Sequence, residues 1–105
     1  MVAVSLPGRA REALESSLPA DAMRIVIVDD EPLARARMRQ ILVDELGMQV
    51  VGEAANAGEA RTAIEEQFPD ALFVDIEMPG ESGLDLAREM ELTGLPVVIV
   101  TAHER

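Results

Sequence analysis

Short runs of consecutive apolar residues recur along the chain, and three of them end on polar side chains. These runs cover residues 25–28, 71–74 and 97–100, and the side chains that follow them are Asp29 with Asp30, Asp75, and Thr101. Continuous runs of Val, Ile and Leu are typical of strands buried on both faces of a parallel sheet. Residues 49–54 form a more mixed run, which predicts a strand at the edge of that sheet.

Amphipathic segments between these runs predict three helices. The first begins at Glu31-Pro32 and ends near Leu46 before Gly47, the second begins after Asn56 and ends near Phe68, and the third begins after Ser82 and ends at Thr93 before Gly94. Asn and Ser are favoured N-caps, and Gly is favoured just beyond a helix end. We expect the second helix to turn its apolar residues inward, Phe68 among them. Strands alternating with helices predict βαβ units and a doubly wound α/β fold around a parallel sheet.

Residues 1–22 do not share this pattern. Leu6-Pro7-Gly8 and Leu18-Pro19-Ala20 interrupt the segment, and no apolar stripe is evident. One interpretation is a regulatory or partner-binding arm. The other, which we favour, is a disordered N-terminal extension, or an upstream start with Met23 as the true first residue. The chain therefore divides into an extension, 1–22, and a domain, 23–105.

Composition limits the function. Of the 105 residues, 49% are hydrophobic but only 2% are aromatic, so the core must be aliphatic. A net charge of −11 opposes direct binding of nucleic acid, because its phosphates would be repelled. The chain has no cysteine, which excludes disulfides and thiolate sites, and no apolar run approaches the ~20 residues of a membrane span. We expect a cytoplasmic protein in which this segment contacts neither nucleic acid nor membrane.

The carboxylates at the strand ends define the candidate site. Because the carboxyl ends of parallel strands meet at one edge of a sheet, Asp29, Asp30 and Asp75 should lie together. Like charges that close raise one another's pKa unless a cation lies among them, and a few hard oxygen ligands suit Mg²⁺. The alternative is that these acids are solvent-facing loop residues that need no cation. Two acid-ended apolar strands in one short domain favour the metal site.

Three sequence motifs follow one another along residues 23–105. They are Ile-Val-Ile-Val-Asp-Asp-Glu-Pro at 25–32, Leu-Phe-Val-Asp-Ile-Glu-Met-Pro-Gly at 72–80 with Ser-Gly-Leu at 82–84, and Val-Val-Ile-Val-Thr-Ala at 97–102. In this order and spacing they closely resemble the receiver domain of bacterial response regulators. The segment Asp-Asp-Glu-Pro-Leu-Ala-Arg at 29–35 is most similar to receivers that precede a LytTR-type DNA-binding domain. The resemblance implies a CheY/flavodoxin-like sheet with strand order 2-1-3-4.

The resemblance also implies residue roles. Asp75 matches the acceptor of a phosphoryl group from a sensor histidine kinase. Asp29 and Asp30 match the acidic pair that binds Mg²⁺ together with Asp75 and the backbone carbonyl of Glu77. The hydroxyl of Thr101 matches the group that turns toward the phosphoryl group. Glu77 and His103 match positions that tune dephosphorylation, although for His103 we favour a solvated loop histidine.

Three arginines on the first predicted helix invite a phosphate-binding interpretation. Arg35, Arg37 and Arg39 all lie within this helix, and Arg35 and Arg39 are one turn apart. We expect instead that they form its solvated surface.

The chain departs from the family pattern in two respects. All nine basic residues are arginine, so the lysine that the family places after its fifth strand has no counterpart. The resemblance stops after the fourth strand, and we expect a C-terminally incomplete receiver without the fifth strand and last two helices. Such a domain would leave the strand at 97–100 with an exposed edge and the first helix with an apolar patch, both open to self-association.

Two function hypotheses follow. The first is two-component phosphorelay signal transduction with transcriptional regulation as the family output, in which the chain gains and loses one phosphoryl group and is not an enzyme for an external substrate. The second is a non-phosphorylated binding module, or truncated receiver fragment, that docks on a kinase or another receiver. A metal-dependent phosphatase is a weaker third hypothesis, because no general acid or substrate pocket can be placed.

Overall fold

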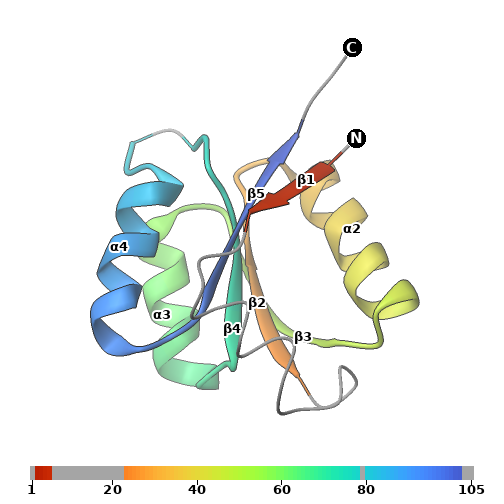
Figure 1. The fold of residues 1–105 in the computed structure, drawn as a ribbon, viewed down its shortest axis with the longest axis horizontal. Coiled ribbons are helices and arrows are strands. Elements are labelled where there is room, and N and C mark those ends of the chain that lie inside the picture. The colour runs from red at the N-terminus through yellow and green to blue at the C-terminus, as the bar shows by residue number, and fades with distance from the viewer. Residues whose placement is uncertain (1, 6–22, 79, 103–105) are drawn as a thin grey trace.

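A five-stranded sheet with helices on both faces forms the protein. The computed structural model describes residues 2–5, 23–78 and 80–102, with side chains described for 23–78 and 80–100. The strands are β1 (Val2–Ser5), β2 (Arg24–Val28), β3 (Gln49–Ala54), β4 (Ala71–Asp75) and β5 (Val97–Ala102). The helices are α2 (Pro32–Gln40), α3 (Ala57–Gln67) and α4 (Gly83–Thr93), with a π-helical turn, η2 (Ile41–Glu45), continuing α2. In Figure 1, α3 and α4 cover one face of the sheet and α2 covers the other.

The strand order confirms the predicted α/β fold. The sheet runs β1-β5-β4-β2-β3, and β2 is parallel to β3 and β4, as β4 is to β5. Counted from β2, this is the order 2-1-3-4, and β3 lies at the edge as expected. All four parallel strands therefore present their carboxyl ends at the same side of the molecule.

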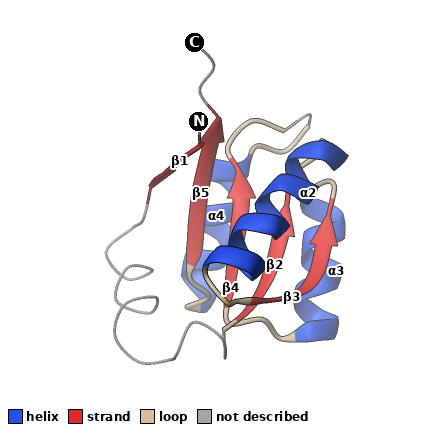
Figure 2. Ribbon diagram, turned by 90° about the vertical axis from the view of Figure 1, so that its right-hand side faces the viewer, coloured by secondary structure: helices blue, strands red, loops and turns tan. Residues whose placement is uncertain are grey.

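The first strand corrects two expectations. Val2–Ser5, which we had assigned to a disordered extension, pair antiparallel with β5 in the register Val2↔Ala102 to Ser5↔Ile99. β1 therefore covers the edge of β5 from Ile99 to Ala102, whereas Val97 and Val98 have no partner in β1 (Figure 2). As long as β1 stays in place, it blocks self-association through the paired part of that edge. The prediction for residues 6–22 lies outside the described residues.

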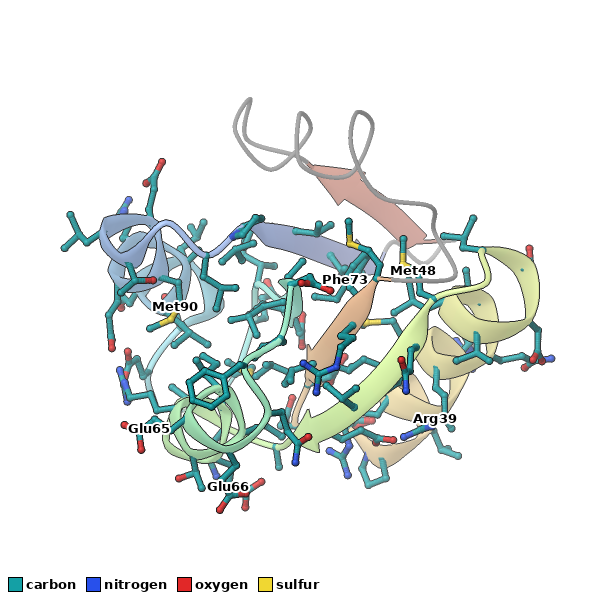
Figure 3. All side chains as sticks on the ribbon, turned by 90° about the horizontal axis from the view of Figure 1, so that it is seen from below. Arg39, Met48, Glu65, Glu66, Phe73 and Met90 are labelled. Carbon is teal, nitrogen blue, oxygen red and sulfur yellow. The ribbon has the colours of Figure 1, made fainter. Side chains whose placement is uncertain are left out.

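The core has two halves because successive strand residues point to opposite faces of the sheet. Val26, Val28, Leu72 and Val74 pack on the side of α3 and α4, with Leu86 and Met90. Ile25, Ile27 and Phe73 pack on the other side with Leu42 of η2, and Met48 packs against them. Figure 3 shows Met90 on one side of the sheet and Phe73 and Met48 on the other. Both faces of β2 and β4 are buried, which explains their unbroken apolar sequence.

Most helix ends lie where the sequence predicts them. The Asn56 side chain accepts a hydrogen bond from the Glu59 amide, and the Ser82 side chain accepts one from the Asp85 amide. Gly94 ends α4 with a positive φ of 84°. Within the described residues, no helix combines the length and apolar character needed to cross a bilayer.

Phe68 was placed wrongly. It ends α3 in the left-handed region, with a φ of 48°, and its side chain is 76% exposed. The left-handed backbone conformation at Phe68 directs its side chain away from the helix face on which Ile64 packs against the core. The first helix also buries little: α2 has no fully buried residue, and Leu33 is 76% exposed.

Candidate functional site

Three carboxylates meet at the carboxyl ends of β2 and β4, as predicted. Asp29 and Asp30 follow β2, Asp75 ends β4, and Val28 of β2 is paired with Val74 of β4. One oxygen from each carboxylate lies within 4.8 Å of one from each of the others. Asp29 is 6% exposed, whereas Asp30 and Asp75 are half-buried. The cluster is thus open to solvent on one side only.

Backbone amides fix the orientation of two of these side chains. Asp29 Oδ1 accepts a hydrogen bond from the Glu31 amide at 2.9 Å, and Asp75 Oδ1 accepts one from the Glu77 amide at 3.1 Å. The Asp29 amide donates to the Ala54 carbonyl of β3, and the Ile76 amide donates to the Val100 carbonyl of β5. Each acid is therefore held by the strand next to it and by the loop that follows it.

The acidic cluster has an excess of negative charge, which shows in the pKa values of its members. Burial raises the pKa of Asp75, and repulsion from Asp29 and Asp30 adds to this, while the hydrogen bond from Glu77 opposes it. Burial likewise raises the pKa of Asp29, with the Glu31 amide opposing and Asp30 reinforcing the shift. Among the described side chains, none forms an ion pair with these three acids. The charge of Arg35 opposes the rise in the pKa of Asp29, but it does so without a direct ion pair.

This donor set fits a hard divalent cation. Three carboxylates that converge from two strands, with solvent on the open side, match the few protein oxygens plus waters that Mg²⁺ prefers. A cation there would offset the repulsion that raises the pKa of Asp75.

The start of α4 lies against the end of β4 with no room for a side chain. A Cβ atom added to Gly83 would lie 2.1 Å from the Asp75 carbonyl oxygen. The Gly83 amide donates to the Ile76 carbonyl at 3.2 Å, which closes the loop 76–82 at its base. Glycine is required here for space, and its absence of a side chain lets the helix approach the acidic cluster.

The arginines of α2 only partly match the expectation of a solvated surface. Arg37 and Arg39 are exposed, but the Arg35 side chain is only 20% exposed. Arg35 donates from Nη1 to the Asp29 carbonyl at 2.6 Å and from Nε to Glu53 of β3 at 3.1 Å. Arg35 therefore binds the backbone of Asp29, and its charge partly opposes the rise in the pKa of that carboxyl, although the two side chains form no ion pair.

A second charged cluster lies beside the loop that follows Asp75. Arg61 of α3 contacts Glu81 in the loop and Glu89 of α4, at 2.5 Å and 2.6 Å from Nη2. Sequence reasoning missed this cluster, because Arg61 lies on a polar helix face and its partners are 20 and 28 residues away. We refer to Arg61, Glu81 and Glu89 as the arginine clamp.

The remaining predicted site residues are placed incompletely. Thr101 lies in β5 directly after Val100, which is paired with Asp75, so its backbone is at the carboxyl edge of the sheet. Its side chain and His103 lie outside the described part of the chain. The Glu77 side chain is exposed, and its amide is the donor to Asp75.

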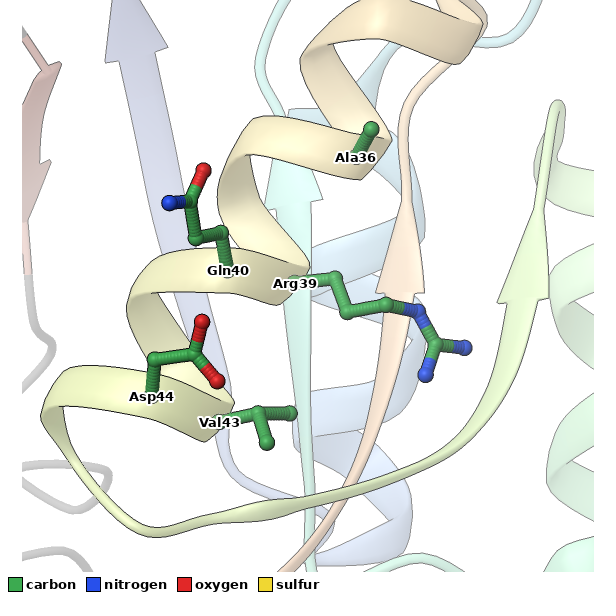
Figure 4. A pocket seen from close by; sticks show the side chains of 5 residues that line it. All are labelled: Ala36, Arg39, Gln40, Val43 and Asp44. Atoms are coloured by element: carbon green, nitrogen blue, oxygen red, sulfur yellow. The ribbon is translucent and has the colours of Figure 1, made fainter.

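A shallow hollow on the outer surface of the first helix is separate from the acidic cluster. It is lined by Ala36, Arg39, Gln40, Val43 and Asp44 of α2 and η2 (Figure 4). Because all five side chains come from one continuous helix, the hollow is a surface depression, and none of the clustered acids lines it.

Comparison with known proteins agrees with this geometry. A family model described as the response regulator receiver domain matches residues 25–105, which include all three clustered acids. The transcriptional regulatory protein BtsR of Salmonella typhi is 42% identical over 83 residues, covering 78% of this chain and 35% of BtsR. A protein-glutamate methylesterase/protein-glutamine glutaminase of Hahella chejuensis is 44% identical over 81 residues, covering 76% and 23%.

A solved structure is similar over most of its own length. The signal receiver domain of NarL from Mycobacterium tuberculosis has a TM-score of 0.65 and 31% identity, covering 79% of this chain and 68% of that one. By contrast, the chain spans about a third of the length of the curated relatives that it matches first.

Proposed function

The chain belongs to the response regulator receiver family, and on this basis we propose that it accepts a phosphoryl group on Asp75 from a sensor histidine kinase in a two-component phosphorelay. The observation that carries the proposal is the convergence of Asp29, Asp30 and Asp75 at the carboxyl edge of the sheet. Receiver domains bind Mg²⁺ at an acidic pocket of this kind and interact with histidine kinases. They are generally not enzymes for external substrates, and the methylesterase relatives are far longer than this chain.

The hydrogen bonding of Asp75 supports its role as the nucleophile. Its Oδ1 atom is occupied by the Glu77 amide, which leaves Oδ2 to attack the phosphorus atom of a phosphohistidine. The new O–P bond forms as the P–N bond breaks, and the histidine nitrogen leaves with the electron pair. Water later cleaves the acyl phosphate, which restores the carboxylate and releases inorganic phosphate.

Asp29 and Asp30 are the residues that would hold Mg²⁺, together with Asp75 and the carbonyl of Glu77. When bound, Mg²⁺ supplies the positive charge that neutralises the phosphoryl oxygens during transfer. Thr101 is our proposed switch hydroxyl, and Glu77 and His103 our proposed residues for tuning hydrolysis. The position of Thr101, one residue beyond the partner of Asp75 in β5, supports its part of this assignment.

The output proposed for the longer family members is transcriptional control. The similarity to BtsR, which is named a transcriptional regulatory protein, supports it. The motif at 29–35 supports the narrower proposal of a LytTR-type partner domain, and a cytoplasmic location follows from the same pathway. A histidine kinase is the partner that the phosphoryl acceptor requires.

One observation favours a second candidate function. Among the described side chains, no cation forms an ion pair with Asp29, Asp30 or Asp75. A receiver-like module that docks without being phosphorylated would account for that absence.

Acetyl phosphate separates the two functions. With Mg²⁺ present, we expect intact-mass spectrometry to show the addition of one phosphoryl group, mapped to Asp75 by fragmentation. Asp75→Asn should remove the addition, as should chelation of Mg²⁺, whereas Asp85→Asn, an exposed acid on α4, should leave it unchanged. If the chain stays unmodified while a complete receiver is modified in parallel, phosphotransfer is wrong and the docking module is favoured.

A further inference from the structure

The loop between β4 and α4 connects the acceptor to the arginine clamp. Residues 76–82 begin next to Asp75 and contain Glu77, whose amide donates to Asp75 Oδ1. The base of the loop is closed by the hydrogen bond from Gly83 to Ile76, and Met78 is anchored in the core at 9% exposure. These contacts fix the first part and the base of the loop. Its far side is held by another contact.

That contact is the salt bridge between Arg61 and Glu81. Arg61 binds Glu89 through two nitrogens, with Nη2 to Oε1 at 2.6 Å and Nε to Oε2 at 3.0 Å. This two-point contact orients the guanidinium group, because a planar fork matched to a carboxylate fixes both direction and distance. The oriented Nη2 also reaches Glu81 Oε2 at 2.5 Å. Glu89 therefore holds Arg61, and Arg61 holds the loop.

The charges of the clamp agree with this order of contacts. The hydrogen bonds that Arg61 donates to Glu89 and then to Glu81 raise the pKa of Arg61, and the bond accepted from Arg61 lowers the pKa of Glu89. The guanidinium group also offsets the charge of Glu81. Glu81 lies in the same loop as the Glu77 amide, which donates a hydrogen bond to Asp75. Without Arg61, an uncompensated carboxylate would lie in a loop that must approach a phosphoryl group.

We infer that Arg61 is a positioning residue for phosphorylation of Asp75: by holding Glu81 it fixes the loop 76–82, and thereby the Glu77 backbone, against the acceptor. This inference rests on the proposed function for its effect on phosphorylation. Its effect on the geometry of the Glu77 amide does not depend on that function. The competing explanation is that Arg61 only bridges α3 and α4, through Glu89.

Five variants of the full chain separate these explanations. Arg61→Gln removes both salt bridges, and Glu81→Gln weakens only the contact to the loop. Glu89→Gln weakens the bridge between the helices directly and the contact to the loop only through the orientation of Arg61. Arg39→Gln is the matched control, because Arg39 forms an exposed ion pair with Glu53 on the other face of the sheet. Arg61→Lys keeps the charge but loses the two-point geometry.

Three quantities are measured for each variant: the melting temperature, the phosphorylation rate with acetyl phosphate and Mg²⁺, and the exchange rate of the Glu77 amide proton by NMR. For Arg61→Gln we expect the phosphorylation rate per folded molecule to fall about tenfold, as expected for a reacting group displaced by less than 1 Å. The Glu77 amide should exchange faster. Glu81→Gln should reproduce both effects with little change in melting temperature, and Arg61→Lys should restore only part of the rate.

A purely structural role predicts another pattern. Under it, Arg61→Gln and Glu89→Gln lower the melting temperature, while the phosphorylation rate per folded molecule and the Glu77 exchange rate equal those of Arg39→Gln. That result overturns the inference. If the wild-type chain is not phosphorylated at all, the proposed function fails, and the Glu77 exchange rate alone decides whether Arg61 positions the loop.

Discussion

The loop between β4 and α4 connects two groups of three charged side chains, which differ in how their negative charges are balanced. In the arginine clamp, the guanidinium group of Arg61 lies between two carboxylates, and the pKa of Glu89 falls below its usual value. In the acidic cluster, three carboxylates converge without a described cationic partner, and the pKa values of Asp29 and Asp75 rise. In the clamp, both the positive and the negative charges come from the chain itself. The acidic cluster has no ion-paired partner of this kind among the described residues.

This difference indicates which acids stabilise the fold when they are charged and which oppose it. A carboxylate with an internal partner contributes to stability when charged, whereas carboxylates crowded without one oppose it. The acidic cluster is maintained although it costs stability, because surrounding backbone amides and Gly83 hold it in place.

The largest effect should come from disrupting the acidic cluster without changing a carboxylate. In Gly83→Ala, the new Cβ would lie 2.1 Å from the Asp75 carbonyl, so the end of β4 or the start of α4 must move. We expect a loss of about 3 kcal/mol in the free energy of unfolding, measured with urea, and weaker Mg²⁺ binding. Gly58→Ala is the control: its Cβ would lie 3.3 Å from the Asn56 side chain, and the change should stay within about 1 kcal/mol. Equal stability of the two variants would contradict this account of Gly83.

Mg²⁺ should stabilise the folded protein through the acidic cluster and not through the arginine clamp. At a hundred times its dissociation constant, a ligand specific for the folded state adds about 2.7 kcal/mol to the free energy of unfolding. We expect urea midpoints to rise with Mg²⁺ for the wild-type chain and for Glu81→Gln, but not for Asp30→Asn. A midpoint of Asp30→Asn that rises like the wild type would remove Asp30 from the site.

Acidification should affect the two clusters in opposite directions. The pKa of Asp75 is raised above its usual 3.8, so its folded form binds a proton more readily than its unfolded form. Its contribution is most favourable below pH 3.8 and is lost as the pH rises through the folded pKa. The pKa of Glu89 is lowered from 4.5, so its contribution is present above pH 4.5 and is lost as the pH falls through the folded pKa.

Single variants separate these contributions in metal-free buffer. At neutral pH, Asp75→Asn should be more stable than the wild type, because one of three like charges is removed. Glu89→Gln should be less stable than the wild type. Both differences should shrink when the unfolding free energies are measured below pH 3.8. If both variants were more stable than the wild type at neutral pH, or both less stable, the contrast between the two clusters would be wrong.

The smallest effect belongs to an ion pair that joins neither cluster. Arg39 contacts Glu53 at 2.7 Å, but its side chain is 47% exposed. We expect Arg39→Ala to cost no more than about 0.5 kcal/mol, and less at high salt, without changing Mg²⁺ affinity. A change in Mg²⁺ affinity measured by calorimetry would show that Arg39 acts on the site through Glu53 and Arg35.

The elements of the acidic cluster could be predicted because their signal is local. An apolar run that ends on an acid is visible in six consecutive residues, and parallel strands bring such ends together. The arginine clamp could not be predicted, since its geometry depends on how α3 packs against α4. The space requirement of Gly83 was hidden for the same reason: it arises from a backbone eight positions earlier.

Two errors have equally specific causes. The spacing of Phe68 from Ile64 suited a helix face, but the backbone leaves the helix at Phe68 itself. For β1, four residues of alternating sequence carry too little information, and the strand with which they pair lies near the other end of the chain.

That pairing has a consequence for how the protein folds. The parallel contacts of β2 with β3 and of β4 with β5 join strands connected by one helical segment, and the contact of β2 with β4 spans two such segments and β3. By contrast, β1 meets β5 only after nearly the whole chain has closed on itself. The entropy of loop closure grows with the length enclosed, so contacts of this kind form late and raise the contact order. β1 should therefore dock last and open first, and until it docks, a folding molecule has the bare edge of β5 available to any other strand.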